Sequence, residues 1–97
     1  MRISIRNNAQ LPKKHLRFIK WKFYNMKEKF QHLIYAEVFL NSEGQSPKTY
    51  IANIRLGVKG NDIIIQTKSK DLRKLCQKSV QSVHRYLEKN KQLALAG

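Results

Sequence analysis

Hydrophobic residues recur along this chain at two different spacings, and each spacing predicts a different kind of element. Residues 2–6 alternate, with Ile3 and Ile5 on one side and polar side chains on the other, which is typical of a short strand. Beyond Pro12, a residue suited to the first position of a helix, the spacing changes to three and four. We therefore expect an amphipathic helix with an apolar stripe of Leu16, Ile19, Phe23, Met26, Phe30 and Leu33.

Residues 34–67 return to alternation and predict three more strands. Residues 42–48 have the composition of a loop, and the turn at residues 59–62 joins its two flanking strands as a hairpin. The expected inward positions are Ile34, Ala36, Val38 and Leu40 in the first of these strands and Tyr50, Ala52, Ile54, Leu56 and Val58 in the second.

A second helix is predicted after Ser69, which can act as its N-cap, with Asp71 in the first turn. Its apolar stripe contains Leu72, Leu75, Cys76, Ser79, Val83, Tyr86 and Leu87. The element order is then β-α-β-β-β-α, and two one-sided helices need one face of a sheet to cover them. We expect an α+β fold, a two-layer sandwich in which a four-stranded sheet carries both helices on one face. Residues 1–92 form this single domain, and residues 93–97 form a frayed tail.

Charge is the outlier in the composition. The 97 residues include 20 Lys or Arg and 6 Asp or Glu, which gives a net charge of +14 and a pI near 10.3. Residues 13–33 and 70–91 carry nearly all of the excess, whereas residues 34–69 are almost neutral. Such a field repels copies of itself, which favours a monomer when free, and attracts polyanions, meaning nucleic acid or an acidic membrane surface. The two predicted helices are therefore the expected contact surface.

Other features indicate a soluble cytoplasmic protein. Cys76 is the only cysteine, so an internal disulfide is impossible and a reducing compartment is the natural expectation. The first residues contain no apolar stretch of the kind found in secretory signals. The longest apolar run, at residues 33–40, is too short to span a bilayer.

Basic side chains are expected to line the outward faces of both helices. Lys74, Lys78, Arg85 and Lys89 fall in a narrow angular range opposite the apolar stripe, and such a row can follow a phosphate backbone. Trp21 and Tyr24 point away from the first stripe and suit stacking on RNA, although Trp21 is almost as well explained by packing at the helix edge. On the first helix the basic candidates are Lys14, Arg17, Lys20, Lys22 and Lys29.

Catalytic interpretations find little support in the sequence. His15, His32, His84 and Cys76 show no metal-ligand spacing, and the carboxylates are scattered. His84 and Glu88 are one helical turn apart, which favours a surface pair over a metal site. We expect no enzyme activity, no small-molecule substrate, no cofactor and no metal.

Residues 58–72, "VKGNDIIIQTKSKDL", together with the length and element order, resemble the ribosome hibernation-promoting factor and ribosome-associated inhibitor family. The chain departs from that family at Arg73, where a Tyr is common, and at Asn25 and Ser82, where a Lys is common. The positions that fit are Val58, Gly60, Asp62, Ile63 and Asp71 in this run, Lys22, Phe23 and Phe30 in the first helix, and Arg85, Leu87, Lys89 and Lys91 in the last.

The resemblance implies a specific function. Both basic helices would bind ribosomal RNA in the neck of the small ribosomal subunit, where messenger and the anticodon ends of transfer RNAs otherwise sit. The protein would thereby inhibit translation and preserve idle ribosomes in starvation or stationary phase. It would be a short form of the family, without the dimerising domain of longer relatives.

Two other interpretations stay open. The α-β-β-β-α part also resembles double-stranded RNA-binding domains, with Lys70, Arg73 and Lys74 at the start of the last helix, but those domains lack a leading strand like residues 2–6. The basic and aromatic first helix could instead lie on an anionic membrane. The predicted sheet argues against this, because it needs the same apolar stripe.

Overall fold

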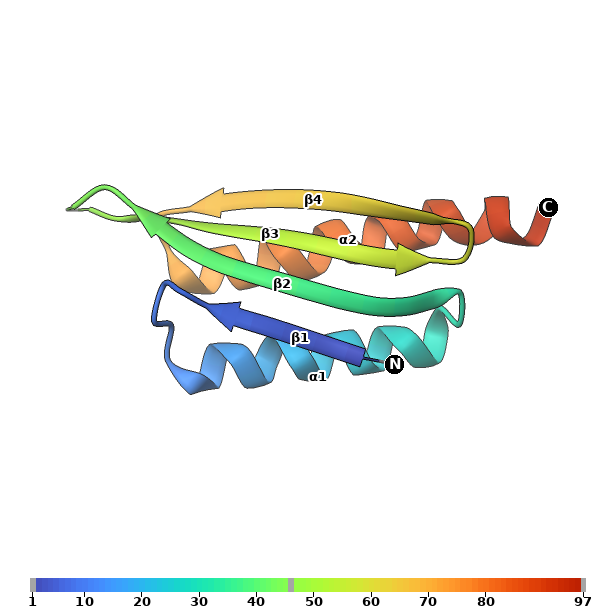
Figure 1. Cartoon of the computed structure of the whole chain (residues 1–97), viewed down its shortest axis with the longest axis horizontal. Helices are drawn as coiled ribbons and strands as arrows, with labels where there is room; N and C mark the ends of the chain where they lie inside the picture. The colour runs from blue at the N-terminus through green and yellow to red at the C-terminus, as the bar shows by residue number, and fades with distance from the viewer. Residues whose placement is uncertain (1, 46, 97) are drawn as a thin grey trace.

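The alternating segments of the sequence form strands, and the segments with apolar stripes form helices (Figure 1). The computed structural model describes residues 2–45 and 47–96, with side chains described as far as Lys89. The predicted order β-α-β-β-β-α is confirmed. The elements are β1 (Arg2–Asn7), α1 (Lys13–Lys29), β2 (Leu33–Glu43), β3 (Thr49–Val58), β4 (Asn61–Ser69) and α2 (Leu72–Ala96).

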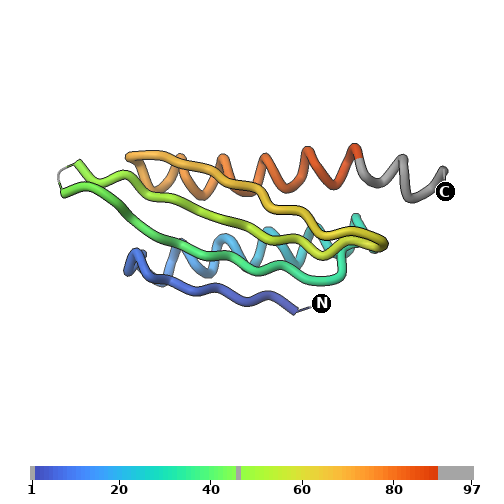
Figure 2. Tube along the Cα trace, turned by 45° about the horizontal axis from the view of Figure 1, so that its top comes forward, coloured from blue at the N-terminus to red at the C-terminus, as the bar shows by residue number. Residues whose placement is uncertain are grey.

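The four strands form one mixed sheet in the order β1-β2-β3-β4. β1 and β2 are parallel because α1 carries the chain back between them, whereas β2, β3 and β4 follow one another as antiparallel hairpins. Figure 1 and Figure 2 show both helices on one face of the sheet, running side by side in the same direction. The predicted two-layer α+β sandwich is therefore confirmed.

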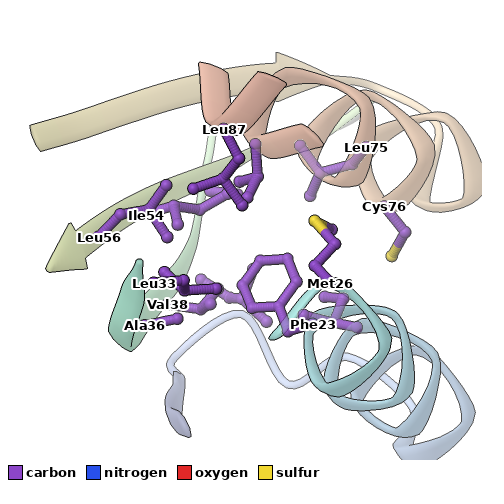
Figure 3. Packing of buried hydrophobic residues seen from close by; sticks show 14 of the residues in the cluster. Phe23, Met26, Leu33, Ala36, Val38, Ile54, Leu56, Leu75, Cys76 and Leu87 are labelled. Carbon is purple, nitrogen blue, oxygen red and sulfur yellow. The ribbon is translucent and has the colours of Figure 1, made fainter. Parts of the chain in front are cut away.

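The core fills the space between the sheet and the helices (Figure 3). Phe23 and Met26 from α1 and Leu75 and Leu87 from α2 point toward Ile54 and its neighbours on the sheet. The inward positions predicted for β3 and the stripe predicted for α2 are all buried or packed against this cluster. Because the helices turn their apolar faces to the sheet, their charged faces must project away from it.

α1 ends earlier than its apolar stripe predicts. Phe30 and Leu33 are fully buried, but Phe30 is the C-cap of the helix and Leu33 is the first residue of β2. The N–H of Phe30 donates to the Met26 carbonyl at 2.7 Å, which closes the last turn. The Lys27 ammonium then donates to two carbonyls beyond the helix, including that of Leu33 at 2.7 Å. The stripe therefore continues across a turn and not along a helix.

The inward orientation predicted for Ile34 is wrong. Its side chain is 54% exposed, while that of Leu33 is buried. Leu33 pairs with Val58 and Tyr35 pairs with Gly57, so β2 has one extra residue at this point. Such a β-bulge shifts the alternation by one residue. Beyond the bulge the predicted inward positions are buried, namely Ala36, Val38 and Leu40.

Two element boundaries also differ from the prediction. Asp71, not Ser69, caps α2, because its carboxylate accepts hydrogen bonds from the N–H groups of Arg73 at 2.9 Å and Lys74 at 3.2 Å. Pro12 is the N-cap of α1 and not its first helical residue. The expected domain boundary at residue 92 and frayed tail at 93–97 fall where side chains lie outside the described residues, so both stay predictions.

On the face of the sheet opposite the helices, several side chains form a cluster around Tyr35. The ring of Tyr35 lies over Gly57, where no side chain stands in its way. The Tyr35 hydroxyl donates to the Asp62 carboxylate at 3.0 Å, and Arg55 binds the same carboxylate at 3.2 Å. The Arg2 guanidinium lies 5.7 Å from the centre of the Tyr35 ring. Arg55 and Asp62 are thus already paired on this face.

Candidate nucleic-acid interface

α1 and α2 lie next to each other on one face of the sheet (Figure 2), so the charged faces that they turn away from the sheet adjoin. Three carboxylates accompany the cations there, those of Glu28, Asp71 and Glu88, so this surface is strongly positive among the described residues. Lys22 is half-buried, and the exposed predicted cations are Lys14, Arg17, Lys20, Lys29, Lys74, Lys78, Arg85 and Lys89.

A groove of about 710 Å³ lies between the two helices. Lys22 and Lys29 line it from α1, and Arg85 and Lys89 line it from α2. Four of the predicted binding residues, two from each helix, are thereby brought around one concavity. The remaining lining residues are Asn25, Met26, Val80, Gln81, His84 and Glu88.

Glu88 of α2 forms a salt bridge across this groove to α1. Its carboxylate accepts from the Lys29 ammonium at 3.1 Å, across the helix pair, and lies 3.9 Å from Nε2 of His84. The His84 ring packs edge-on against Phe30, with 5.3 Å between the ring centres. The expected surface pair of His84 and Glu88 is therefore present, and Lys29 joins it. One predicted cation is thus held by a carboxylate before any ligand arrives.

Trp21 and Tyr24 are open to solvent, as predicted. Their side chains are 59% and 51% exposed, and they do not line the groove. The Lys22 ammonium lies 5.0 Å from the centre of the Trp21 ring and 5.7 Å from that of Phe18. Both aromatic residues therefore offer exposed ring surface, and Trp21 does so beside a cation, which is an arrangement used for stacking on bases.

The predicted row on α2 runs from the groove toward β4. Arg85 and Lys89 also border a smaller hollow, which is completed by Ser82, Tyr86 and Ile65 of β4. The Lys78 ammonium donates to the Lys68 carbonyl of β4 at 3.4 Å. Lys74 stands in the first turn of α2, whereas Arg17 and Lys20 lie on α1 outside the groove. Lys91 falls where side chains lie outside the described residues.

A second hollow, of about 450 Å³, lies between the first turns of the two helices. Burial, together with the charges of Lys14 and Arg73, lowers the pKa of His15 from its ordinary value. Burial raises the pKa of the Cys76 thiol. Lys14 is one of the predicted RNA-binding residues, and Arg73 belongs to the duplex-RNA interpretation. Spacing along the sequence does not bring the set together, because its members meet only when the helices lie side by side. The lining residues are Lys14, His15, Phe18, Arg73, Cys76 and Gln77.

The described residues contain neither a cluster of metal ligands nor a membrane-spanning helix. No group of three or more His, Cys, Asp or Glu side chains is placed to hold a metal ion there. In the same part of the chain, no helix is both long enough and apolar enough to cross a bilayer.

Neither a family model nor a curated protein matches this sequence. Solved structures do match. A ribosomal subunit interface protein from Coxiella burnetii aligns with a TM-score of 0.78 and 14% identity, over 95% of this chain and 99% of that chain. The N-terminal domain of Protein Y from Thermus thermophilus aligns with a TM-score of 0.70 and 16% identity, over 91% of this chain and 93% of that chain.

The chain has the fold of these two proteins. The family resemblance found in residues 58–72 and in the element order is thereby confirmed at the level of the fold. The likeness extends over nearly the whole backbone of all three chains. At 14% and 16% identity it assigns no role to individual side chains.

Proposed function

We propose that this protein binds ribosomal RNA of the small ribosomal subunit through α1 and α2 and occludes the channel for messenger and transfer RNA. The observation that carries the proposal is the groove between two basic helices, on a fold shared with a ribosomal subunit interface protein. In the cytoplasm such binding would inhibit translation and preserve idle ribosomes in starvation or stationary phase, as the family resemblance implies.

In the proposed mechanism the protein acts by occupying the RNA channel and catalyses no reaction. Exposed lysines and arginines on both helices neutralise phosphates and release their counterions, which favours binding regardless of base sequence. Phosphate contacts position a protein but do not read bases. Specificity must therefore come from the shape of a folded RNA channel, into which two parallel helices with a groove between them can fit. Trp21 and Tyr24 would add stacking at the side of α1.

Sedimentation of purified small subunits through a sucrose cushion tests this proposal directly. The protein should co-pellet saturably at about one copy per subunit, and messenger with initiator transfer RNA should compete with it. Binding that never saturates, or that is indifferent to a filled channel, would contradict occlusion. A comparison with a plain RNA duplex in a gel shift then separates ribosome binding from general duplex binding.

Two matched charge-reversal variants test whether the helix surface is the one that binds the small subunit. Lys78→Glu combined with Arg85→Glu should weaken co-pelleting about tenfold or more, because two phosphate contacts become repulsive. Lys48→Glu combined with Lys59→Glu makes the same change in net charge in the exposed hairpin loops. This control should bind nearly as well as the parent protein. Equal losses in both variants would show attraction by overall charge and not by the helix surface.

A further inference from the structure

The hollow between the first turns of α1 and α2 differs in composition from the main groove. Two cations line it, Lys14 from α1 and Arg73 from α2, and no carboxylate is among its lining residues. Phe18 and Gln77 also line it, so an aromatic residue and an amide residue stand beside the two cations. Its volume of about 450 Å³ lies within the range of small-molecule pockets, about 300 to 1,000 Å³. The hollow therefore combines positive charge with apolar and hydrogen-bonding surface.

The orientation of His15 adds a further polar group to this hollow. Its Nδ1 lies 3.9 Å from the Sγ atom of Cys76, which is only 2% exposed. This contact holds one side of the imidazole against the buried thiol, and His15 and Cys76 both line the hollow.

We propose that this hollow binds a single nucleotide. Lys14 and Arg73 would hold its phosphate, since guanidinium and ammonium groups are the usual partners of phosphate oxygens. The base would stack on Phe18, with Gln77 and His15 within reach of its edge. The base must be unpaired, because a base inside a duplex has both faces covered by its neighbours.

Two sources supply this chemistry, a free mononucleotide and an unpaired nucleotide of an RNA chain. The second source deepens the proposed function, because it would fix the register of the helices on ribosomal RNA. The first source is independent of ribosome binding. The two can be separated with the isolated protein, so the outcome does not depend on the sedimentation experiment.

His15 provides a local reporter for occupancy. The charged groups that face it are Lys14 on its own helix and Arg73 on α2, and Cys76 lies behind it. Both cations disfavour the imidazolium form, and a bound phosphate offsets them. The pKa of His15 should therefore rise when the hollow is occupied.

The experiment is an NMR titration of the full chain with adenosine 5′-monophosphate, adenosine, inorganic phosphate and a short single-stranded RNA, each followed over pH. We expect saturable shifts at His15, Phe18 and Gln77 with the monophosphate or with the single-stranded RNA. Shifts with the monophosphate identify a free-nucleotide site, and shifts with the RNA alone identify an RNA subsite. Adenosine and phosphate should each bind more weakly, because each lacks half of the recognised group.

Variants test which side chains carry the binding. Arg73→Ala should weaken binding about tenfold by removing a charge-assisted contact, and Phe18→Leu about fivefold or more by removing the stacking surface at similar volume. Lys48→Ala combined with Lys59→Ala removes more charge from the hairpin loops and serves as the control. It should leave the affinity within about twofold.

Several outcomes would overturn the proposal. They are shifts as strong with phosphate as with the nucleotide, an affinity indifferent to Phe18→Leu, equal weakening by the control, or no localised shift with any probe. The first three would identify a general anion effect. The last would leave the hollow without a nucleotide ligand.

Discussion

At the scale of single residues, small side chains decide where large ones can lie. Gly57 is the clearest case, because a Cβ atom there would collide with the ring of Tyr35. That ring crosses the sheet to reach Asp62 and lies beneath Arg2. A glycine in the interior of a strand is ordinarily unfavourable. At this position it permits a cross-strand contact that no larger residue allows.

Gly57→Ala should therefore destabilise the fold by about 1 to 3 kcal/mol, the usual cost of inserting a methyl group into occupied space. In a Tyr35→Ala background the same substitution should cost much less, because the ring is no longer there. Urea unfolding of the parent protein, the two single variants and the double variant measures the coupling between Gly57 and Tyr35. Additive effects in the double variant would show that the ring simply moves aside.

His15 should make the stability of the protein depend on pH. Burial and two neighbouring cations lower its pKa in the folded state, so the unfolded chain takes up a proton first as the pH falls. Stability should therefore drop as the pH falls through the ordinary histidine pKa of about 6.5. His15→Gln should reduce this drop. Urea unfolding at about pH 7.5 and about pH 5.5 tests it, and an unchanged pH dependence in the variant would refute it.

At the scale of elements, the two helices begin in different ways. α2 has a carboxylate cap from Asp71, whereas no side chain caps α1 at Pro12. α1 instead depends on its tertiary contacts, since Ile19, Phe23 and Met26 are buried on the sheet. Helical stability in proteins comes mostly from such packing. The cap matters more for α2, whose first turn carries Arg73 and Lys74 at the proposed binding surface.

Asp71→Ala should cost about 1 kcal/mol of stability, the typical value for losing an N-cap acceptor. Asp71→Asn keeps an acceptor of the same shape and should remain close to the parent protein. Urea unfolding compares the three. If Asp71→Asn is as unstable as Asp71→Ala, the negative charge at the start of α2 matters more than its two hydrogen bonds.

At the scale of the whole molecule, the helix layer and the opposite face of the sheet differ in charge and shape. Both helices carry their cations on the outer side of one layer, while Arg55 on the opposite side of the sheet is paired with Asp62. α1 and α2 run in the same direction (Figure 2), and the groove lies between the second half of α1 and residues 80–89 of α2. In the proposed function this positive face would attract RNA, and we expect like charges to keep free copies of the protein apart.

Binding to small subunits should weaken steeply with salt. If about six phosphate contacts form, the logarithm of the affinity should fall against the logarithm of the salt concentration with a slope of roughly −4 to −5. Lys78→Ala combined with Arg85→Ala should reduce the magnitude of that slope by roughly 1.5 to 2. Sedimentation over a series of salt concentrations measures both values. A slope near zero would contradict the electrostatic account.

Prediction from the sequence succeeded where one local pattern carried the information. Phe23, Met26, Leu75 and Leu87 are buried as their helical spacing predicts. It failed at Ile34, because a bulge between β2 and β3 depends on how the two strands pair. Local patterns specify the face of an element, but pairing decides its exact register.

The candidate sites likewise depend partly on local sequence patterns and partly on tertiary packing. Spacing alone was enough to place Lys74, Lys78, Arg85 and Lys89 on the outer face of α2 and to leave Trp21 exposed, because a helix projects each residue at a fixed angle. Only the tertiary structure brought Lys22 and Lys29 around one groove with Arg85, and Lys14 beside Arg73. These residues are far apart in the chain, and their proximity follows from the packing of two helices on one sheet.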